Sequence, residues 1–346
     1  MKINIKTTDD IRTLMKMHLL PAAVATALEL HLFWHLNDQA LSLEEISQDF
    51  KIPLDRCHYW LELLVELGLL KREHMKYTPT SLSQSAILEA YSPESWSFLA
   101  QAAREQYITG NNLSLYISHP KSVLTAQGQK SLDWFKRIQE DLNYARQFTY
   151  TLYEIHYSSG ELLAQSLNMK GAKRMMDLGG GSGVMSLALL KRNPDLNAVV
   201  IDIPNVCEIG REIASKTSVA NRIEYCAADY DNDDLPTGFD MILNCDAGGF
   251  EQKLLHKLFK ALNKGGQLII VSNIEIDSDW LETHPREDLS FPLLLRFFQN
   301  SLTASKLSHM TITEAKKCLI ETGFHSVIEE IVENRILIIR GQKPNS

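Results

Sequence analysis

The chain has 346 residues, of which 45% are hydrophobic and 23% charged, and its formal net charge is −8. This composition is typical of a soluble globular protein rather than a fibrous or disordered one, and the length predicts two domains. A sequence-independent nucleic-acid surface needs clustered Lys and Arg to displace counterions. The acidic balance therefore predicts that nucleic acid is not a partner.

The cysteines indicate a reducing compartment. Five cysteines are scattered along the chain without a CxxC pair or a metal-ligand spacing, so we expect free thiols, no disulfide and no bound metal. The N-terminus has no basic stretch followed by an apolar signal core, and the longest apolar run, at 19–28, is too short to span a bilayer. We expect a cytoplasmic protein without a membrane partner.

The first hundred residues predict a small helical domain. Apolar residues recur at helical spacing over 11–36, and Pro21 predicts a break between two helices there. Ser42 and Glu45 form a potential capping box at the start of the next helix. An amphipathic helix over 54–69 and a hairpin over 71–78 complete the pattern helix, helix, helix, hairpin.

This order is typical of a winged helix, whose third helix enters a DNA groove in regulators. Here that helix, DRCHYWLELLVEL, sets one Arg against three acids, Asp55, Glu62 and Glu66, so its chemistry favours dimerisation over DNA reading. The apolar first helices suit a subunit interface. We therefore expect residues 1–100 to form a winged-helix dimerisation domain that makes a homodimer.

The rest of the chain predicts a helical linker followed by an α/β domain. We expect residues 101–165 to form helices that cover the mouth of the next domain and so roof the pocket for its small-molecule acceptor. From Lys173 onward, short apolar strands alternate with helices, which predicts a doubly wound, mostly parallel sheet within 166–346; the strands are RMMDL, AVVID, RIEYCA, FDMIL and QLIIVS. Two final strands, at 326–331 and 335–340, are joined by a short turn, so one of them must run antiparallel.

A glycine-rich turn follows the first of these strands. The segment DLGGGSG, Asp177 to Gly183, leads directly into a helix, and its glycines let backbone N–H groups approach a ligand closely; they are Gly179, Gly180, Gly181 and Gly183. A dinucleotide GxGxxG fingerprint would need Gly at Val184, and no Gly-Lys-Ser/Thr follows for a P-loop.

Polar residues also end the next strands. Asp202, followed by Ile203, can accept both hydroxyl hydrogens of an adenosyl ribose. Asp229 offers an acceptor for the adenine amino group, and Tyr230 offers a ring edge against the base. Each residue alone could be structural, but their recurrence at successive strand ends predicts a nucleoside cofactor. We place Asn244 and Cys245, after the fourth strand, in the same cofactor site.

With these motifs, the chain resembles the S-adenosylmethionine-dependent small-molecule O-methyltransferases related to plant caffeate and hydroxyindole enzymes and to bacterial natural-product methyltransferases. The resemblance covers nearly the whole chain and rests on the winged helix and on DLGGGSG, IDIPNV, AADY, ALNKGG and ETGF. It implies a Rossmann-like domain with a seven-stranded sheet whose last strand is antiparallel. It also implies S-adenosylmethionine as cofactor, S-adenosylhomocysteine as product, and a homodimer that acts on a small-molecule acceptor.

The chain departs from this family at its acid–base residues. The family has a His after the fourth strand, in a LHDW segment, and two orienting Glu residues. Alignment from either side of the shortened segment CDAGGFEQ puts Asn244 or Gly249 at the His position, and the Glu positions hold Ser272 and His309. None of the three family residues is present.

Several consequences follow from this departure. His309 or His156, each near a family active-site position, could serve as the general base near neutral pH. Alternatively, the acceptor is already anionic, or is a nucleophilic carbon, nitrogen or sulfur that needs only proximity and desolvation. A third reading is a cofactor-binding enzyme that does not transfer methyl, for example in a cyclisation, and a fourth is a winged-helix regulator that senses the cofactor.

The family correspondence also implies the walls of the acceptor site. It places Phe148 and Leu152 against the acceptor, with core packing as the competing interpretation. The bulky stretch 289–302, with Leu295 and Phe298, should form the other wall and favours an apolar or aromatic, polyketide-like acceptor of secondary metabolism.

Overall fold

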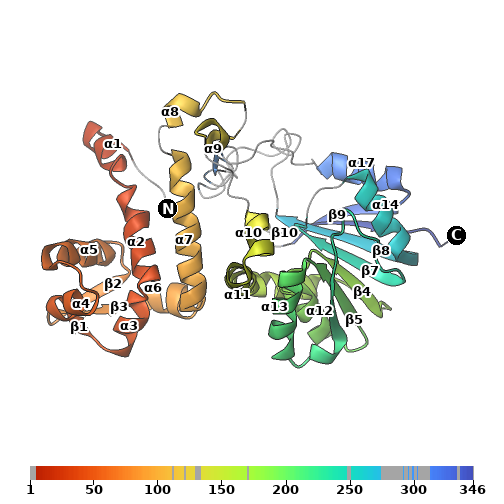
Figure 1. Cartoon of the computed structure of the whole chain (residues 1–346), viewed down its shortest axis with the longest axis horizontal. Helices are drawn as coiled ribbons and strands as arrows, with labels where there is room; N and C mark the ends of the chain where they lie inside the picture. The colour runs from red at the N-terminus through yellow and green to blue at the C-terminus, as the bar shows by residue number, and fades with distance from the viewer. Residues whose placement is uncertain are drawn as a thin grey trace. The chain divides into compact units, whose positions relative to one another are not determined.

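A computed structural model describes residues 5–110, 113–120, 122–128, 134–169, 171–247, 251–273, 312–332 and 336–345, with residues 291, 295, 298, 299 and 302. It contains two compact units, Met1–Ser131 with Phe291–Ser305, and Leu132–Ser290 with Lys306–Ser346 (Figure 1). The division into domains at 1–100, 101–165 and 166–346 stays a prediction beside these two units.

The first unit combines helices with a small sheet. Its three strands pair in the antiparallel order β1-β3-β2. The elements are α1 (Thr8–Leu14), α2 (Leu19–Glu29), α3 (Leu32–Asp38), β1 (Leu41–Ser42), α4 (Leu43–Asp49), α5 (Leu54–Glu66), β2 (Leu70–Glu73), β3 (Lys76–Pro79), α6 (Ser81–Ser83), a π-helical turn (Gln84–Leu88), α7 (Pro93–Gly110), α8 (Leu113–Tyr116) and α9 (Val123–Ala126).

The prediction for residues 11–36 was wrong in its break. Three helices cover this region, and Pro21 lies inside α2 instead of between two helices. Pro21 is the third residue of α2, in the first turn, where a backbone N–H has no intrahelical partner and its absence costs little. The chain breaks instead before Leu19 and at His31, which has a left-handed φ of 55°.

The capping box, the helix end at Gly68 and the hairpin predicted for this unit are confirmed. Ser42 and Glu45 form both hydrogen bonds of the capping box that opens α4. Gly68 follows α5 with a φ of 71°, and the β2–β3 hairpin comes next. The Glu62 carboxylate on α5 accepts hydrogen bonds from Arg72 and from the Tyr77 hydroxyl, each at 2.9 Å, so this acid attaches the helix to the hairpin.

Within the described ranges, no single helix is long and apolar enough to cross a lipid bilayer. One bent pair, Thr8–Glu29 with Leu32–Asp38, meets the criterion by length and composition.

The second unit is a seven-stranded mixed sheet with helices on both faces. The strand order is β6-β5-β4-β7-β8-β10-β9, and β10 runs antiparallel to both of its neighbours, as predicted. Its elements are α10 (Trp134–Glu140), α11 (Leu142–Ser166), β4 (Arg174–Leu178), α12 (Val184–Arg192), β5 (Asn197–Asp202), α13 (Pro204–Ser215), a 3₁₀ turn (Ala220–Arg222), β6 (Ile223–Ala227), β7 (Phe239–Cys245), α14 (Gln252–Ala261), β8 (Leu262–Asn273), α17 (Ile312–Thr322), β9 (His325–Val332) and β10 (Ile336–Gln342).

One boundary differs from the prediction. The fifth strand, expected to begin at QLIIVS after a turn in ALNKGG, already begins at Leu262 of that segment, whose Ala261 ends α14. Phe239 of β7 pairs with Leu262 and Met241 pairs with Gln267, so the extra residues of β8 form a local irregularity in the ladder. Gly265, with a φ of 75°, lies within it. A glycine in a strand often marks such a bulge, which explains why it resembled a turn.

Alternate residues of the central strands fill two hydrophobic cores. Met175 and Met241 face the core formed with α11, α12 and α13, whereas Met176 and Ile242 face the core formed with α14 and α17. This period of two is the reason that the strands appear as nearly continuous apolar runs. Helix α11 packs on both α12 and α13 on one face of the sheet (Figure 1).

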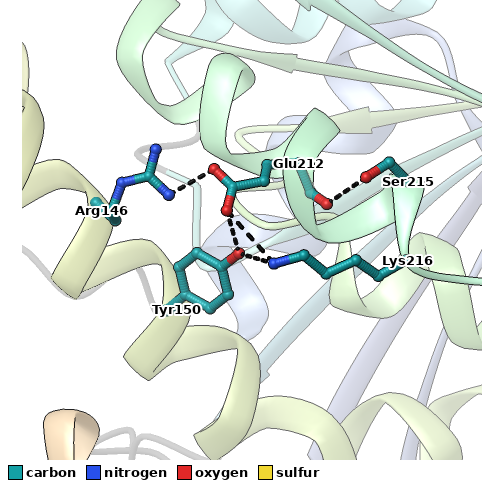
Figure 2. A network of polar contacts seen from close by, with 5 residues as sticks. All are labelled: Arg146, Tyr150, Glu212, Ser215 and Lys216. Atoms are coloured by element: carbon teal, nitrogen blue, oxygen red, sulfur yellow. Dashed lines mark hydrogen bonds and ion pairs between the residues drawn. The ribbon is translucent and has the colours of Figure 1, made fainter.

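A polar network attaches α11 to α13 (Figure 2). Arg146 and the Tyr150 hydroxyl of α11 donate to the two carboxylate oxygens of Glu212, the latter at 2.8 Å. Lys216 donates to the Tyr150 oxygen at 2.7 Å, and the Ser215 hydroxyl donates to the Glu212 carbonyl at 2.7 Å. The Arg146 and Tyr150 hydrogen bonds lower the pKa of Glu212 from 4.5 to about 2.

We predict that Glu212→Gln lowers the urea midpoint of unfolding at neutral pH and that this difference from wild type shrinks as the pH falls. The folded-state pKa is depressed, so the stability contributed by ionised Glu212 is present above about 4.5 and is lost as the pH falls towards about 2. Urea unfolding of wild type and variant at pH 6 and pH 3.5 measures this difference in midpoint. The exposed Glu224 provides the control variant, Glu224→Gln, and an equal loss for both variants would contradict the assignment.

Candidate active site

The glycine turn after β4 has a backbone that other residues adopt only at a cost. Gly179, Gly181 and Gly183 have left-handed φ values of 60°, 57° and 76°. The Gly179 N–H donates to the Ile201 carbonyl of β5 at 2.7 Å, which fixes the start of the turn. Gly183 is the N-cap of α12, so the turn delivers the chain into the first N–H groups of that helix.

The space around the turn is filled everywhere except at one position. A Cβ on Gly179 would lie 2.3 Å from the Ala247 Cβ, and one on Gly180 would lie 2.5 Å from the Asp177 Cγ. A Cβ on Gly183 would lie 2.5 Å from the Tyr225 hydroxyl. Around a Cβ added at Gly181, no atom of the described residues lies within 4 Å, so this residue faces open space beside the turn.

Asp177 supports the turn from inside the protein. Its side chain is buried, and its Oδ2 accepts a 2.6 Å hydrogen bond from the Ser186 hydroxyl of α12. Burial raises the pKa of Asp177 to about 7, against the opposing effect of the Ser186 hydrogen bond. Its other oxygen, Oδ1, is buried without a hydrogen-bond partner among the described residues. A buried acid with an unpartnered oxygen is a potential acceptor for a cationic donor.

Asp202 joins the glycine turn to β5. Its Oδ2 accepts the Gly181 N–H at 2.8 Å, and its Oδ1 accepts the N–H of Ile203 at 2.7 Å. Burial raises its pKa, whereas these two hydrogen bonds lower it. An ionised carboxylate has about four lone-pair sites, so capacity remains for two hydroxyl donors beside the open space at Gly181.

The loop after β6 carries Asp229 and Tyr230. Asp229 is exposed, and its carboxylate accepts from the Asp231 N–H at 3.0 Å and from the Asn232 side chain at 2.8 Å. The Asn232 hydrogen bond is the largest cause of its lowered pKa. The Tyr230 ring is half-buried, and its Cε1 would lie 3.8 Å from a Cβ on Gly179. The loop thus reaches from the edge strand to the glycine turn.

The other residues predicted for the cofactor site lie at the same edge of the sheet. Asn244, at the end of β7, is buried, and its Oδ1 accepts the Ala247 N–H at 3.1 Å, which holds Ala247 over Gly179. Cys245 follows it, and burial raises its pKa well above the usual value, so its thiol stays neutral. Ile203 is half-buried against the core that includes α11.

One stripe of α11 leads towards this edge. Phe148, Leu152, His156 and Gly160 follow at intervals of four residues, which places them on one side of the helix. A Cβ on Gly160 would lie 3.2 Å from the carbonyl oxygen of Val184, the first residue of α12. His156 is therefore one helical turn from the contact with the glycine turn's helix.

The two ends of the stripe differ in chemistry. The Phe148 ring stacks on that of Trp134, with 5.7 Å between centroids and 17° between planes. At the other end, burial lowers the pKa of His156, and the negative charge of Asp246, just after β7, partly opposes this effect. The imidazole is thus neutral at pH 7, and the Asp246 carboxylate is close enough to influence its pKa.

Three predicted site residues are not among the described residues of the second unit. His309 lies outside the described residues. Leu295 and Phe298 belong to the first unit, where their side chains are 52% and 48% exposed, whereas Phe148 and Leu152 belong to the second unit. The two predicted acceptor walls are therefore on different units.

Sequence reasoning missed several residues that shape the turn. The Tyr225 hydroxyl donates to the Ser182 carbonyl at 2.8 Å, and its ring fills the space beside Gly183 and Gly210. Its position among the inward-facing residues of β6 was the available signal. Ser186 and Asp246 could not be singled out from the sequence: Ser186 is one of several polar residues near the turn, and Asp246 acts on His156, which is far away along the chain. In the part of the chain that is described, no group of three or more His, Cys, Asp or Glu side chains could hold a metal ion.

Comparison with known proteins gives matches over nearly the whole chain. Residues 118–297 match the family model described as an O-methyltransferase domain, and residues 13–87 match the one described as an O-methyltransferase dimerisation domain. The chain is 27% identical to the 3-hydroxy-5-methyl-1-naphthoate 3-O-methyltransferase of Streptomyces sahachiroi, over 79% of this chain and 77% of that protein. It is 23% identical to the N,N-dimethyltransferase OxyT of Streptomyces rimosus, over 90% of this chain and 89% of that protein.

A solved structure shows the same fold. Human N-acetylserotonin methyltransferase in complex with S-adenosylmethionine matches with a TM-score of 0.78, over 99% of this chain and 100% of that chain, at 19% sequence identity.

We predict that Gly179→Ala and Gly181→Ala separate stability from ligand binding. Both glycines have the same left-handed conformation, which costs an alanine about 1–2 kcal/mol. Only Gly179→Ala also creates a clash, with Ala247, so it should lose about 1–3 kcal/mol more in urea unfolding. Gly181→Ala should stay folded but bind S-adenosylhomocysteine more weakly, because its methyl group enters the open space. Equal stability of the two variants would contradict this packing.

We also predict that Asp202→Ala weakens S-adenosylmethionine binding by about 1–3 kcal/mol, the cost of leaving polar partners unpaired. Isothermal titration calorimetry measures this change. Asp195→Ala, at an exposed loop position, is the control and should bind as wild type does. Wild-type affinity in Asp202→Ala would remove Asp202 from the site.

Proposed function

The chain belongs to the O-methyltransferase family, and we propose that it transfers a methyl group to a small aromatic or polyketide-like metabolite, with oxygen as the favoured acceptor atom. As a member of this family it is an S-adenosylmethionine-dependent methyltransferase, and S-adenosylhomocysteine is its product. The proposed class of acceptor rests mainly on the stripe of α11 formed by Phe148, Leu152, His156 and Gly160. It runs from the stacked aromatic rings at Phe148 to the edge of the glycine turn.

The residues at the turn fit this cofactor. Gly181 faces open space, and Asp202 retains lone pairs for the ribose hydroxyls. The unpartnered oxygen of Asp177 suits a cationic group, and S-adenosylmethionine carries both an ammonium and a sulfonium. The cofactor supplies a methyl carbon that the sulfonium has already activated, so the protein's task is to align the acceptor, exclude water and remove a proton where needed.

The aromatic stack supports an aromatic acceptor. Trp134 remains 54% exposed while its ring stacks on Phe148, so a flat apolar surface is available beside the stripe. Aromatic rings prefer offset stacking on other rings, which gives such a surface affinity for a planar acceptor. The two relatives are named for transfer to oxygen and to nitrogen, and both kinds of nucleophile suit this arrangement.

We propose His156 as the general base for a hydroxyl acceptor. It lies one helical turn from the contact between α11 and α12, its burial keeps the imidazole neutral, and Asp246 would stabilise the imidazolium that forms when it takes the proton. His309 stays an alternative candidate. An anionic or amine acceptor would need no base, because proximity and desolvation then supply the rate.

Two further functions compete with methyl transfer. A non-methylating enzyme of this fold would bind the cofactor and give no methylated product. A winged-helix regulator would need a free, basic third helix, but Glu62 on α5 binds the hairpin through Arg72 and Tyr77. That contact speaks against DNA reading, and the match of residues 13–87 to an O-methyltransferase dimerisation domain supports a dimerisation role for the winged helix. We propose a cytoplasmic homodimer that binds neither nucleic acid nor membrane and serves secondary metabolism.

The test combines calorimetry with mass spectrometry. We expect the purified protein to bind S-adenosylmethionine and S-adenosylhomocysteine, and a panel of phenolic and aromatic amine metabolites to yield a product heavier by one methyl group. Sedimentation should show a dimer. The non-methylating function would be favoured by a different set of results. The protein would bind the cofactor, no compound in the panel would gain a methyl group, and an acceptor would be converted by another reaction.

We predict that His156→Gln lowers kcat for a hydroxyl acceptor by about 10²–10⁴-fold, as expected when a general base is removed. Its effect on cofactor affinity should be small. In wild type, the rate should fall as the pH drops through the lowered pKa of His156, because the protonated imidazole cannot accept a proton.

His256→Gln is the matched control, since His256 is exposed on α14. Full activity of His156→Gln, with an unchanged pH profile, would exclude His156 as the base.

A further inference from the structure

Lys257 of α14 makes an unusual set of contacts with the loop after β6. Its ammonium donates to three main-chain carbonyl oxygens, those of Tyr230 at 3.0 Å, Asp231 at 2.8 Å and Asp233 at 2.8 Å. Lys has three donor hydrogens, so all of them are used within one short segment. Its side chain is half-buried there.

The contact spans distant parts of the sheet. The loop begins at the edge strand β6, whereas α14 connects β7 and β8, so β5 and β4 lie between the strands that the contact joins. Between its two ends, the loop passes the glycine turn, where the Tyr230 ring lies beside Gly179. Lys257 therefore fixes the loop across the site that Asp202 and Gly181 form.

The loop needs such a fixing point. The segment DYDNDD, residues 229–234, holds four carboxylates in six residues, and like charges repel at this spacing. Internal hydrogen bonds order its start: the Asp229 N–H donates to the Asp233 carboxylate at 2.9 Å, and the Asp233 N–H donates to the Asp229 carbonyl at 2.7 Å. These bonds shape the turn itself, but they do not attach it to the rest of the domain.

We propose that Lys257 is a positioning residue for the nucleoside half of the cofactor. It holds the 230–233 backbone so that Asp229 and Tyr230 stay beside the glycine turn, and it thereby sets the preference for adenine over other bases. The inference rests on the proposed role of Asp229 and Tyr230 at the adenine. Among the described residues, the Lys257 ammonium donates to this loop alone, so its effect on the reaction passes through cofactor binding.

The test compares two nucleosides in the intact enzyme. Lys257→Met keeps the length and the apolar stem of the side chain but removes all three donors. Calorimetry with S-adenosylhomocysteine and with S-inosylhomocysteine, whose base has an oxygen in place of the amino group, then measures affinity and base preference separately. Lys260→Met, at an exposed position on the same helix, is the control.

We expect Lys257→Met to bind S-adenosylhomocysteine about ten-fold more weakly, as when the binding-competent loop falls to about a tenth of the population. Its preference for the adenine ligand over the inosine ligand should fall towards one. With an acceptor, KM for S-adenosylmethionine should rise while kcat at saturation stays near wild type. Lys257→Gln keeps two donors without the charge, so its affinity and base preference should lie between those of wild type and Lys257→Met. If the Met variant does not fold, the Gln variant provides the same two measurements.

Wild-type affinity and base preference in a folded Lys257 variant would overturn the inference alone. Equal weakening of both ligands would also overturn it, because Lys257 would then support stability without setting the base preference. Failure of the wild-type protein to bind S-adenosylhomocysteine would instead overturn the proposed function, and this inference with it.

Discussion

The turn from β4 into α12 is the constraint on which the site depends. A Cβ added to Gly179, Gly180 or Gly183 would meet Ala247, Asp177 or Tyr225, whereas one added to Gly181 would have no atom of the described residues within 4 Å. A close-packed surrounding permits one backbone path, so the N–H groups of the turn are held in place before any ligand binds. Packing of the described residues thus fixes the turn, and the open space beside Gly181 is where we propose that the cofactor fits.

The other parts of the site are attached to this turn. Asp202 accepts the Gly181 N–H, Asn244 holds Ala247 over Gly179, and α11 packs through Gly160 against the start of α12. The Glu212 network fastens α11 to α13 from the other side. A helix fixed at two places keeps its stripe in one orientation. In the function that we propose, this arrangement would give an acceptor a rigid surface beside the cofactor, which is what methyl transfer by alignment requires.

Local patterns in the sequence predicted most of the fold. The capping box at Ser42, the strand RMMDL and the final antiparallel strand all follow from short-range chemistry, and the structure has each of them. The break at Pro21 was wrong because proline is tolerated in the first turn of a helix, and the ALNKGG segment became part of a bulged strand. The three carbonyls bound by Lys257 lie 24 to 27 residues away, beyond what any local pattern indicates.

The most direct test of the account is a crystal structure of the protein with S-adenosylhomocysteine. The account predicts that the nucleoside lies in the open space beside Gly181, with both ribose hydroxyls on the Asp202 carboxylate and the base next to Tyr230. A ligand bound away from the glycine turn, or a ribose that makes no contact with Asp202, would contradict it.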